Sequence, residues 1–176
     1  MKKLLAWLPL VLLLAGAVGC KKIQQLLTFT VKHSQTIQIP AIPASTQGTL
    51  VTLPPVTVDN SKTYGDNNTR ADLVKDVSLH KLSLSISSPS GQNFDFLQRI
   101  ELYIGSDQSE QVRLAYLDEV PRGVSSIELL STNTKLDQYL KGASYTITTK
   151  VQTRQPVSQA LTVRADMQFK VTADPF

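Results

Sequence analysis

The stretch that decides the fold class reads Leu161-Thr162-Val163-Arg164-Ala165-Asp166-Met167-Gln168-Phe169-Lys170-Val171-Thr172. Its odd-numbered residues are all apolar, whereas its even-numbered residues are all polar or charged. Successive side chains of a β-strand point to opposite faces, so an alternation with a period of two predicts a long strand. We expect one face of this strand to lie in a core and the other to face water, as in an antiparallel sheet.

Two other segments alternate in the same way. Residues 27–31 place apolar residues between threonines, and residues 145–151 carry Tyr145, Ile147, Thr149 and Val151 on one face. Residues 154–158, which contain a proline, separate the second segment from the decisive strand. This spacing predicts an antiparallel hairpin between residues 145–151 and residues 161–171.

Two features of the middle of the chain also indicate strands. Residues 100–104 lead through Gly105 and a short polar turn to Val112, Leu114 and Tyr116, which predicts a second hairpin. Further upstream the apolar positions change phase, from Val77 and Leu79 to Leu82, Leu84 and Ile86. A slip of one residue would expose the whole apolar face, so we predict a β-bulge near His80 and Lys81.

Helical signals are scarce. Thr134 and Asp137 have the spacing of a capping box, and Gly142 follows as a stop, which predicts one short helix near residues 133–141 that covers an open end of the fold. Single turns are expected at residues 93–97 and 70–75. Residues 40–55 contain four prolines, so this segment should be extended and should cross from one sheet to another or lie along an edge.

Together these patterns predict an all-β fold. We expect residues 26–176 to form a single domain, a two-sheet antiparallel β-sandwich of about seven or eight strands.

The first residues of the chain have the pattern of a secretory signal. Two lysines, Lys2 and Lys3, precede an apolar run over residues 4–18, and small residues end the run. The run is shorter than the roughly 20 residues that a helix needs to cross a bilayer. We therefore interpret residues 1–19 as a signal peptide rather than a membrane anchor.

The end of that run, Leu14-Ala15-Gly16-Ala17-Val18-Gly19-Cys20, resembles the lipobox of bacterial lipoproteins. The resemblance implies that a diacylglycerol is attached to Cys20 and that the chain is cleaved before it. The position that is usually leucine holds Ala17 here. Cys20 is the only cysteine, so no disulfide is possible within the chain, and an unmodified thiol would be a liability in an oxidising compartment.

The mature protein would carry little net charge. Removal of the signal peptide leaves 157 residues, with 16 basic and 14 acidic side chains, a net charge of +2. Charges of both signs are scattered along the chain, so nothing favours nucleic-acid binding. Residues 20–25 form a short tether that spans roughly 20 Å when extended, with Lys21 and Lys22 near the lipid headgroups.

The residue after the cysteine also bears on localisation. Lys21 is not the aspartate that holds lipoproteins at the inner membrane of enteric bacteria. By that analogy we expect a lipid-anchored protein of the cell envelope, at the outer membrane and facing the periplasm.

The mature region also resembles small uncharacterised lipoproteins of the Bacteroidota. The shared motifs are Asn68-Thr69-Arg70-Ala71-Asp72-Leu73-Val74, Ile86-Ser87-Ser88-Pro89-Ser90-Gly91, Phe94-Asp95-Phe96-Leu97 and Leu136-Asp137-Gln138-Tyr139-Leu140. The resemblance implies a diderm envelope and a β-rich domain, and it brings no activity with it.

Catalytic and metal-binding patterns are weak. His33 and His80 have no acid or cysteine at ligand spacing, and we expect both on the surface, with His33 at a strand end. The loop that runs from Asp59 to Asn68 is rich in oxygen ligands that suit calcium, but Asp, Asn and Gly are also what a bare turn prefers. We predict no cofactor and no metal, and the loop's calcium binding is left open.

Three functions are consistent with these features. The first is a non-catalytic binding or structural module that takes an envelope protein or glycan partner through a sheet edge or the loops at one end. The second is a hydrolase of envelope polymers that uses the carboxylates of Asp95, Asp118 or Glu119, although Asp118 and Glu119 also fit a solvated turn. The third is carriage of an apolar ligand between the sheets, in a cavity lined by Phe29, Leu102, Tyr145 and Phe169. We favour the first, and we expect the last four residues to pack as core.

Overall fold

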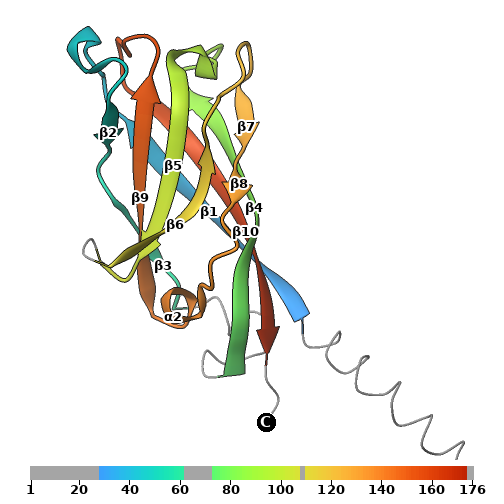
Figure 1. Cartoon of the computed structure of the whole chain (residues 1–176). Coiled ribbons are helices and arrows are strands. Elements are labelled where there is room, and N and C mark those ends of the chain that lie inside the picture. Colours follow the sequence, from blue (N-terminus) through green and yellow to red (C-terminus); the bar gives the residue numbers. More distant parts are fainter. Residues whose placement is uncertain (1–27, 62–72, 108–109, 174–176) are drawn as a thin grey trace, which may run out of the picture.

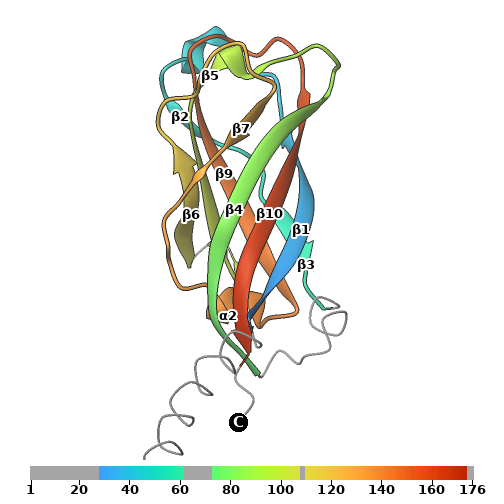
Figure 2. The same ribbon diagram turned by 90° about the vertical axis from the view of Figure 1, so that its right-hand side faces the viewer.

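A computed structural model describes residues 28–61, 73–107 and 110–173 of the chain. In this part, ten strands form two antiparallel sheets that pack face to face (Figures 1 and 2). The predicted all-β sandwich is confirmed. The strand count exceeds the predicted seven or eight because several edge strands are only two to four residues long and carry too little alternation to be recognised.

The four-stranded sheet has the order β1-β10-β4-β7. Its strands are β1 (Thr28–Ile39), β10 (Leu161–Ala173), β4 (Val74–Ser88) and β7 (Ser126–Glu128). The decisive stretch forms β10, which lies between β1 and β4 and buries every odd-numbered residue from Leu161 to Ala173. The predicted half-buried strand is therefore confirmed.

The six-stranded sheet has the order β2-β9-β5-β6-β8, and β3 pairs with β9 as well. Its strands are β2 (Leu50–Thr52), β3 (Val56–Asp59), β5 (Leu97–Gly105), β6 (Gln111–Leu117), β8 (Leu130–Ser131) and β9 (Ser144–Thr153). The hairpin predicted for residues 100–116 is confirmed, since β5 and β6 pair directly.

The hairpin predicted between residues 145–151 and residues 161–171 is wrong. These segments form β9 and β10, which belong to different sheets, and the residues between them cross from one sheet to the other. The alternation shows that each strand buries one face. It does not show which neighbour the strand pairs with, and two strands on opposite sides of one core have the same pattern.

The predicted bulge in β4 is confirmed. Leu79 pairs with Phe169 and Lys81 pairs with Gln168, so His80 is the extra residue in β4. Val77, Leu79, Leu82 and Leu84 are all buried as a result. The bulge is what keeps one apolar face in the core through the change of phase.

The short helix near residues 133–141 is also confirmed, as α2 (Asp137–Leu140). The predicted capping box is wrong, because Leu136 is the N-cap and makes no side-chain cap, while the Thr134 hydroxyl lies 3.0 Å from that of Thr132. Helix α2 contacts β4 and β9, one strand from each sheet, and covers one end of the sandwich (Figure 1).

Of the remaining predicted segments, two are confirmed and one is wrong in part. The turn at residues 93–97 is the 3-10 helix η4 (Phe94–Phe96). The turn predicted at residues 70–75 is wrong in part, since Val74 and Lys75 begin β4, and its first three residues lie outside the described part. Residues 40–55 do cross between the sheets, through the 3-10 helix η1 (Ala44–Thr46) and β2.

The space between the sheets is occupied by packed apolar side chains. Leu102, Tyr145 and Phe169 are fully buried members of this core, and Phe29 packs against it. They belong to the packed core that we favoured over a ligand cavity. Among the described residues, no helix is both long and apolar enough to span a bilayer.

Candidate functional site

The most unusual side chain of the sandwich is the carboxylate of Glu101, on β5. Alternation directs Ile100, Leu102 and Ile104 into the core, so Glu101 lies on the outer face of the six-stranded sheet. A glutamate there is normally solvated, yet Glu101 is only 3 % exposed. The neighbouring side chains must therefore replace the water that it has lost.

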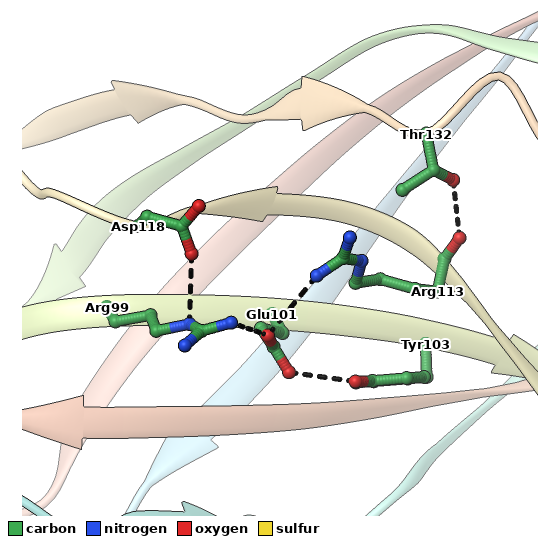
Figure 3. A network of polar contacts seen from close by, with 6 residues as sticks. All are labelled: Arg99, Glu101, Tyr103, Arg113, Asp118 and Thr132. Atoms are coloured by element: carbon green, nitrogen blue, oxygen red, sulfur yellow. Dashed lines mark hydrogen bonds and ion pairs between the residues drawn. The ribbon is translucent and has the colours of Figure 1, made fainter.

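Three side chains surround the Glu101 carboxylate (Figure 3). Arg99 donates to Oε1 from Nη2, and Arg113 Nη1 lies 3.5 Å from the same oxygen. The hydroxyl of Tyr103 donates to Oε2 at 2.8 Å. Arg99 and Tyr103 flank Glu101 at two-residue spacing on β5, and Arg113 pairs with Tyr103 across from β6. The pleat of one strand and the register of its neighbour thus build the cluster.

The cluster also reaches the segments that follow β6 and β8. Arg99 Nε lies 3.0 Å from Oδ1 of Asp118, directly after β6. The hydroxyl of Thr132, directly after β8, donates to the backbone carbonyl of Arg113 (Figure 3). The polar contacts therefore tie β5, β6 and β8 together on the outer face.

These contacts shift the pKa values of two groups. Burial by itself would raise the pKa of Glu101, but the hydrogen bond from Tyr103 and the charges of Arg99 and Arg113 outweigh it and lower the pKa below its ordinary value. Burial and the bond to Glu101 raise the pKa of Tyr103. At neutral pH Glu101 is therefore ionised and Tyr103 is protonated, so Glu101 is poorly suited to act as a general acid.

Two cations lie over tyrosine rings on the same face. Lys150 Nζ is 4.5 Å from the ring centroid of Tyr103, and the guanidinium of Arg113 is 4.4 Å from that of Tyr116. Lys150 and Tyr116 pair with Glu101 from β9 and β6, so these side chains form a row across three strands. We call this surface the charged face; its residues are Arg99, Glu101, Tyr103, Arg113, Tyr116 and Lys150. A cation therefore covers one face of each of these two tyrosine rings.

A hollow of about 470 Å³ lies next to the charged face, where β9 ends and β5 begins. It is lined by Gln98, Glu119, Val120, Pro121, Arg122 and Arg154. Arg154 Nη2 donates to the Val120 carbonyl at 2.5 Å and so fixes the loop after β6. The hollow has the size of a small-ligand site and combines two guanidinium groups with one carboxylate.

The predicted carboxylates have different contacts. Asp95 accepts from the backbone N–H of Gly123 at 2.5 Å and lines a separate hollow of about 160 Å³. Asp118 is paired with Arg99, and Glu119 lines the larger hollow. Asp118 and Glu119 are exposed in the turn that follows β6, as the solvated-turn alternative predicts.

The two histidines have different surroundings. His80 is exposed at the bulge, as predicted. The expectation for His33 is wrong, because it lies within β1 and is half-buried, with Nδ1 2.6 Å from the hydroxyl of Tyr145 and its ring stacked on that of Tyr145. His33 is on the face of β1 that points inward, and β1 is the outermost strand of its sheet, so the ring is only half-buried. This burial lowers the pKa of His33.

The candidate calcium loop is described only at its start, and residues 62–68 lie outside the described part. Asn60 is 2 % exposed, and its amide donates to the backbone carbonyls of Leu140 and Gly142. Asn60 therefore holds the end of α2 in place. In the described residues no group of three or more His, Cys, Asp or Glu side chains could hold a metal ion.

Sequence reasoning missed the Glu101 cluster. The signal was present, since Arg99, Glu101 and Tyr103 alternate with buried aliphatic residues and must share the outer face of one strand. The sequence pattern predicted that this outer face was exposed to solvent. It could not show that β6 would bring Arg113 over it and exclude the water.

Comparison with known proteins identifies no relative. No family model matches the chain, and no curated protein matches it. Among solved structures the chain is similar to FLHE, with 11 % identity, a TM-score of 0.35 and coverage of 83 % of this chain and 97 % of that one. It is also similar to the decameric BFDV capsid protein, with 9 % identity, a TM-score of 0.33 and coverage of 82 % and 98 %. Similarities this distant carry no argument about this chain.

Proposed function

We propose that this chain is a lipid-anchored lipoprotein of a bacterial cell envelope, and that its β-sandwich is a non-catalytic binding module. Its partners would be membrane lipid, through the covalent anchor at Cys20, and an envelope protein or glycan. The charged start, the apolar run and the lipobox-like residues before Cys20 support the anchor. The outer membrane, on its periplasmic side, is the proposed location.

The observation that carries the binding role is the arrangement around Glu101. Its carboxylate holds Arg99, Arg113 and Tyr103 in fixed positions on an open sheet face. Side chains that are already locked by neighbours lose less conformational entropy when a ligand binds. The same contacts keep Glu101 ionised and occupied, which suits a binding surface better than a catalytic one.

The topology supports an outward orientation of the larger hollow. Thr28 begins β1 at the end of the sandwich that α2 covers, since Thr28 pairs with Thr172 beside the start of β4, and Leu136 donates to the Val77 carbonyl there. Strand β9 starts next to α2 and ends at Thr153, directly before Arg154, which lines the hollow. An anchor on Cys20, eight residues before Thr28, would hold the α2 end near the membrane and leave the hollow facing away.

Two measurements test the two halves of the proposal. Metabolic labelling with a radioactive fatty acid should mark the wild type and leave Cys20→Ala unlabelled; an unlabelled wild type would reject the anchor.

Crosslinking in intact envelopes tests the binding role. We expect wild type to capture a specific partner that Arg113→Glu captures poorly, while the control Arg164→Glu, on the outer face of the other sheet, behaves as wild type. Recovery of only bulk lipid and abundant porins by all three proteins would reject the binding role.

A further inference from the structure

The larger hollow lies at the end of the sandwich away from α2 and is lined by three separate segments of the chain (Figure 1). Gln98 lies at the start of β5, Arg154 directly follows β9, and residues 119–122 belong to the loop after β6. These segments meet because β5 lies between β9 and β6 in the sheet. The fold itself therefore builds the hollow, as is usual for small-ligand sites.

Hydrogen bonds fix the walls of this hollow. The backbone N–H of Val120 donates to the Gln98 carbonyl at 3.0 Å. The Arg154 side chain donates to the carbonyl of the same Val120 at 2.5 Å. At the far end of the loop, the N–H of Gly123 donates to the Asp95 carboxylate. A site that is already formed loses little conformational entropy when a ligand binds, so the hollow suits a ligand of defined shape.

A β-bulge places the Gln98 side chain at the wall of the hollow. Leu97 and Arg99 pair with adjacent residues of β9, so Gln98 between them is the extra residue of the bulge. Its side chain is exposed and lines the hollow. Bulges are frequent next to active sites, because the extra residue re-aims a side chain. Here the bulge supplies an amide, which can both donate and accept hydrogen bonds.

Three charged side chains also line the hollow. Arg122 and Arg154 contribute guanidinium groups, and Glu119 contributes a carboxylate. In the described part of the chain, no ion pair involves any of the three. A ligand that enters the hollow therefore meets two charged donors and one charged acceptor.

The ligand must supply groups that complement these side chains. Each guanidinium donates paired hydrogen bonds that suit a carboxylate or a phosphate. Ionised Glu119 only accepts hydrogen bonds, so the ligand must also donate them. Hydroxyl groups next to an acidic group meet both requirements. The volume of about 470 Å³ suits a compact ligand, whereas extended peptides are bound along a groove or a sheet edge.

We infer that the hollow binds an acidic sugar unit of an envelope glycan. The inference rests on the proposed binding role and names the chemistry of its glycan partner. Arg122 and Arg154 bind the acidic group of the sugar, while Glu119 accepts from its hydroxyls and Gln98 pairs with either kind of group.

The experiment titrates five probes into the lipidated protein in detergent micelles. Methyl glucuronide and glucose-6-phosphate carry an acidic group and hydroxyls, whereas methyl glucoside lacks the acidic group. Inorganic phosphate and N-acetylglutamate amide are anionic but are not sugars. NMR signals of the backbone at residues 119–123 and of the Nε–H groups of Arg122 and Arg154 locate the contact, and their shifts give Kd.

We expect one of the two acidic sugars to shift these signals and to bind about tenfold tighter than methyl glucoside, the effect of one charge-assisted hydrogen-bonded pair. The tighter of the two identifies the acidic group as a carboxylate or a phosphate. Inorganic phosphate and N-acetylglutamate amide should bind more weakly than that sugar, because they lack ring hydroxyls for Glu119 and Gln98.

Three variants assign the contacts. Arg122→Gln should weaken the acidic sugar about tenfold and leave methyl glucoside unchanged; Arg122 is exposed, so the change should not prevent folding. Glu119→Ala should narrow the advantage of the acidic sugar over inorganic phosphate, because a hydroxyl acceptor and a repulsive charge are lost together. The control Arg164→Gln, on the outer face of the other sheet, should bind as wild type.

Several results would overturn the inference. Equal affinity for methyl glucoside and the acidic sugars would show that the arginines bind no acidic group. Tighter binding of inorganic phosphate would identify a simple anion site, and tighter binding of N-acetylglutamate amide would identify an acidic peptide as the ligand. Shifts confined to the charged face, or no shift with any probe at tens of millimolar, would reject the hollow as the site.

These failures can be told apart from a failure of the proposed function. If no probe binds but wild type still captures a partner that Arg113→Glu captures poorly, the sugar chemistry is rejected and the binding role stands. Failure of the crosslinking comparison or of fatty-acid labelling would reject the proposed function and would leave the titration unchanged.

Discussion

The two outer faces of the sandwich carry similar chemistry in different surroundings. On the six-stranded sheet, Glu101 is nearly fully buried among two arginines and a tyrosine. On the four-stranded sheet, Asp166 accepts from the Ser34 hydroxyl at 2.5 Å and pairs with Arg164 at 2.9 Å, but the two charged side chains are 38 % and 59 % exposed. Each cluster joins a carboxylate to an arginine two residues away on the same strand.

Access to water, rather than the kind of pair, determines what each cluster contributes. Water already solvates the Asp166 pair, so the pair adds between 0 and about 1 kcal/mol to the free energy of unfolding. Glu101 has lost its water, so its partners are needed to keep it ionised. The Asp166 pair therefore contributes little to the fold, whereas the Glu101 cluster fixes the positions of the side chains on its face.

The largest effect should come from removing both cations of Glu101. In the double variant Arg99→Ala/Arg113→Ala the buried carboxylate keeps only Tyr103, and the free energy of unfolding should fall by about 3–5 kcal/mol. Urea denaturation measures the loss. A loss below about 1 kcal/mol would mean that water reaches Glu101 and that the contrast between the two faces is false.

A smaller effect is expected when the charge is removed and the shape kept. Glu101→Gln still accepts a hydrogen bond from Tyr103 but loses two charge-assisted ones, so we expect a loss of about 2 kcal/mol at pH 7. Because the pKa of Glu101 is lower in the folded protein than its ordinary 4.5, its contribution is present above that value and is lost as pH falls through the folded pKa. Urea midpoints of the two proteins should therefore converge in acid; a constant difference would contradict the pairing.

His33 tests the same link between burial and ionisation in a group of opposite charge. Burial lowers its pKa from 6.5, so the folded protein binds a proton less readily than the unfolded chain. Stability should be complete above about pH 6.5 and should decline as pH falls from there toward the folded pKa. Melting temperatures between pH 8 and pH 5 should show this decline in wild type and a flatter profile in His33→Gln. Equal slopes would assign the decline to other groups.

The smallest effect should be found on the four-stranded sheet. Ser34→Ala removes the first cause of the lowered pKa of Asp166, yet the carboxylate stays solvated and close to Arg164. We expect the free energy of unfolding to change by less than about 1 kcal/mol. Urea denaturation of this variant and of Arg99→Ala/Arg113→Ala gives the two losses side by side. Losses of similar size would contradict the distinction between the two faces.

Much of the fold could be predicted from the sequence, because burial on one face of a strand leaves a pattern that can be read locally. Three features could be predicted from such local patterns: the alternation in β10, the phase change at His80 and the turn between β5 and β6. The partner of a strand leaves no such pattern, which is why the hairpin between β9 and β10 was wrong. The edge strands β7 and β8 are too short for any periodicity.

The candidate site was harder to predict for a related reason. Arg99, Glu101 and Tyr103 share one strand, so their common face follows from spacing alone. Arg113 and Lys150 come from β6 and β9, and their approach depends on the register of pairing. His33 was misplaced because its surroundings are set by Tyr145, which lies far away in the sequence on the opposite sheet.

Glu101 stays ionised at neutral pH and organises the charged face. The most direct test is the titration of the Glu101 side chain, followed through the ¹³C chemical shift of its carboxyl carbon by NMR, with Glu101→Gln used to assign the signal. We expect the midpoint below the ordinary value of 4.5, as the contacts with Tyr103, Arg99 and Arg113 require. A midpoint at or above 4.5 would contradict this account.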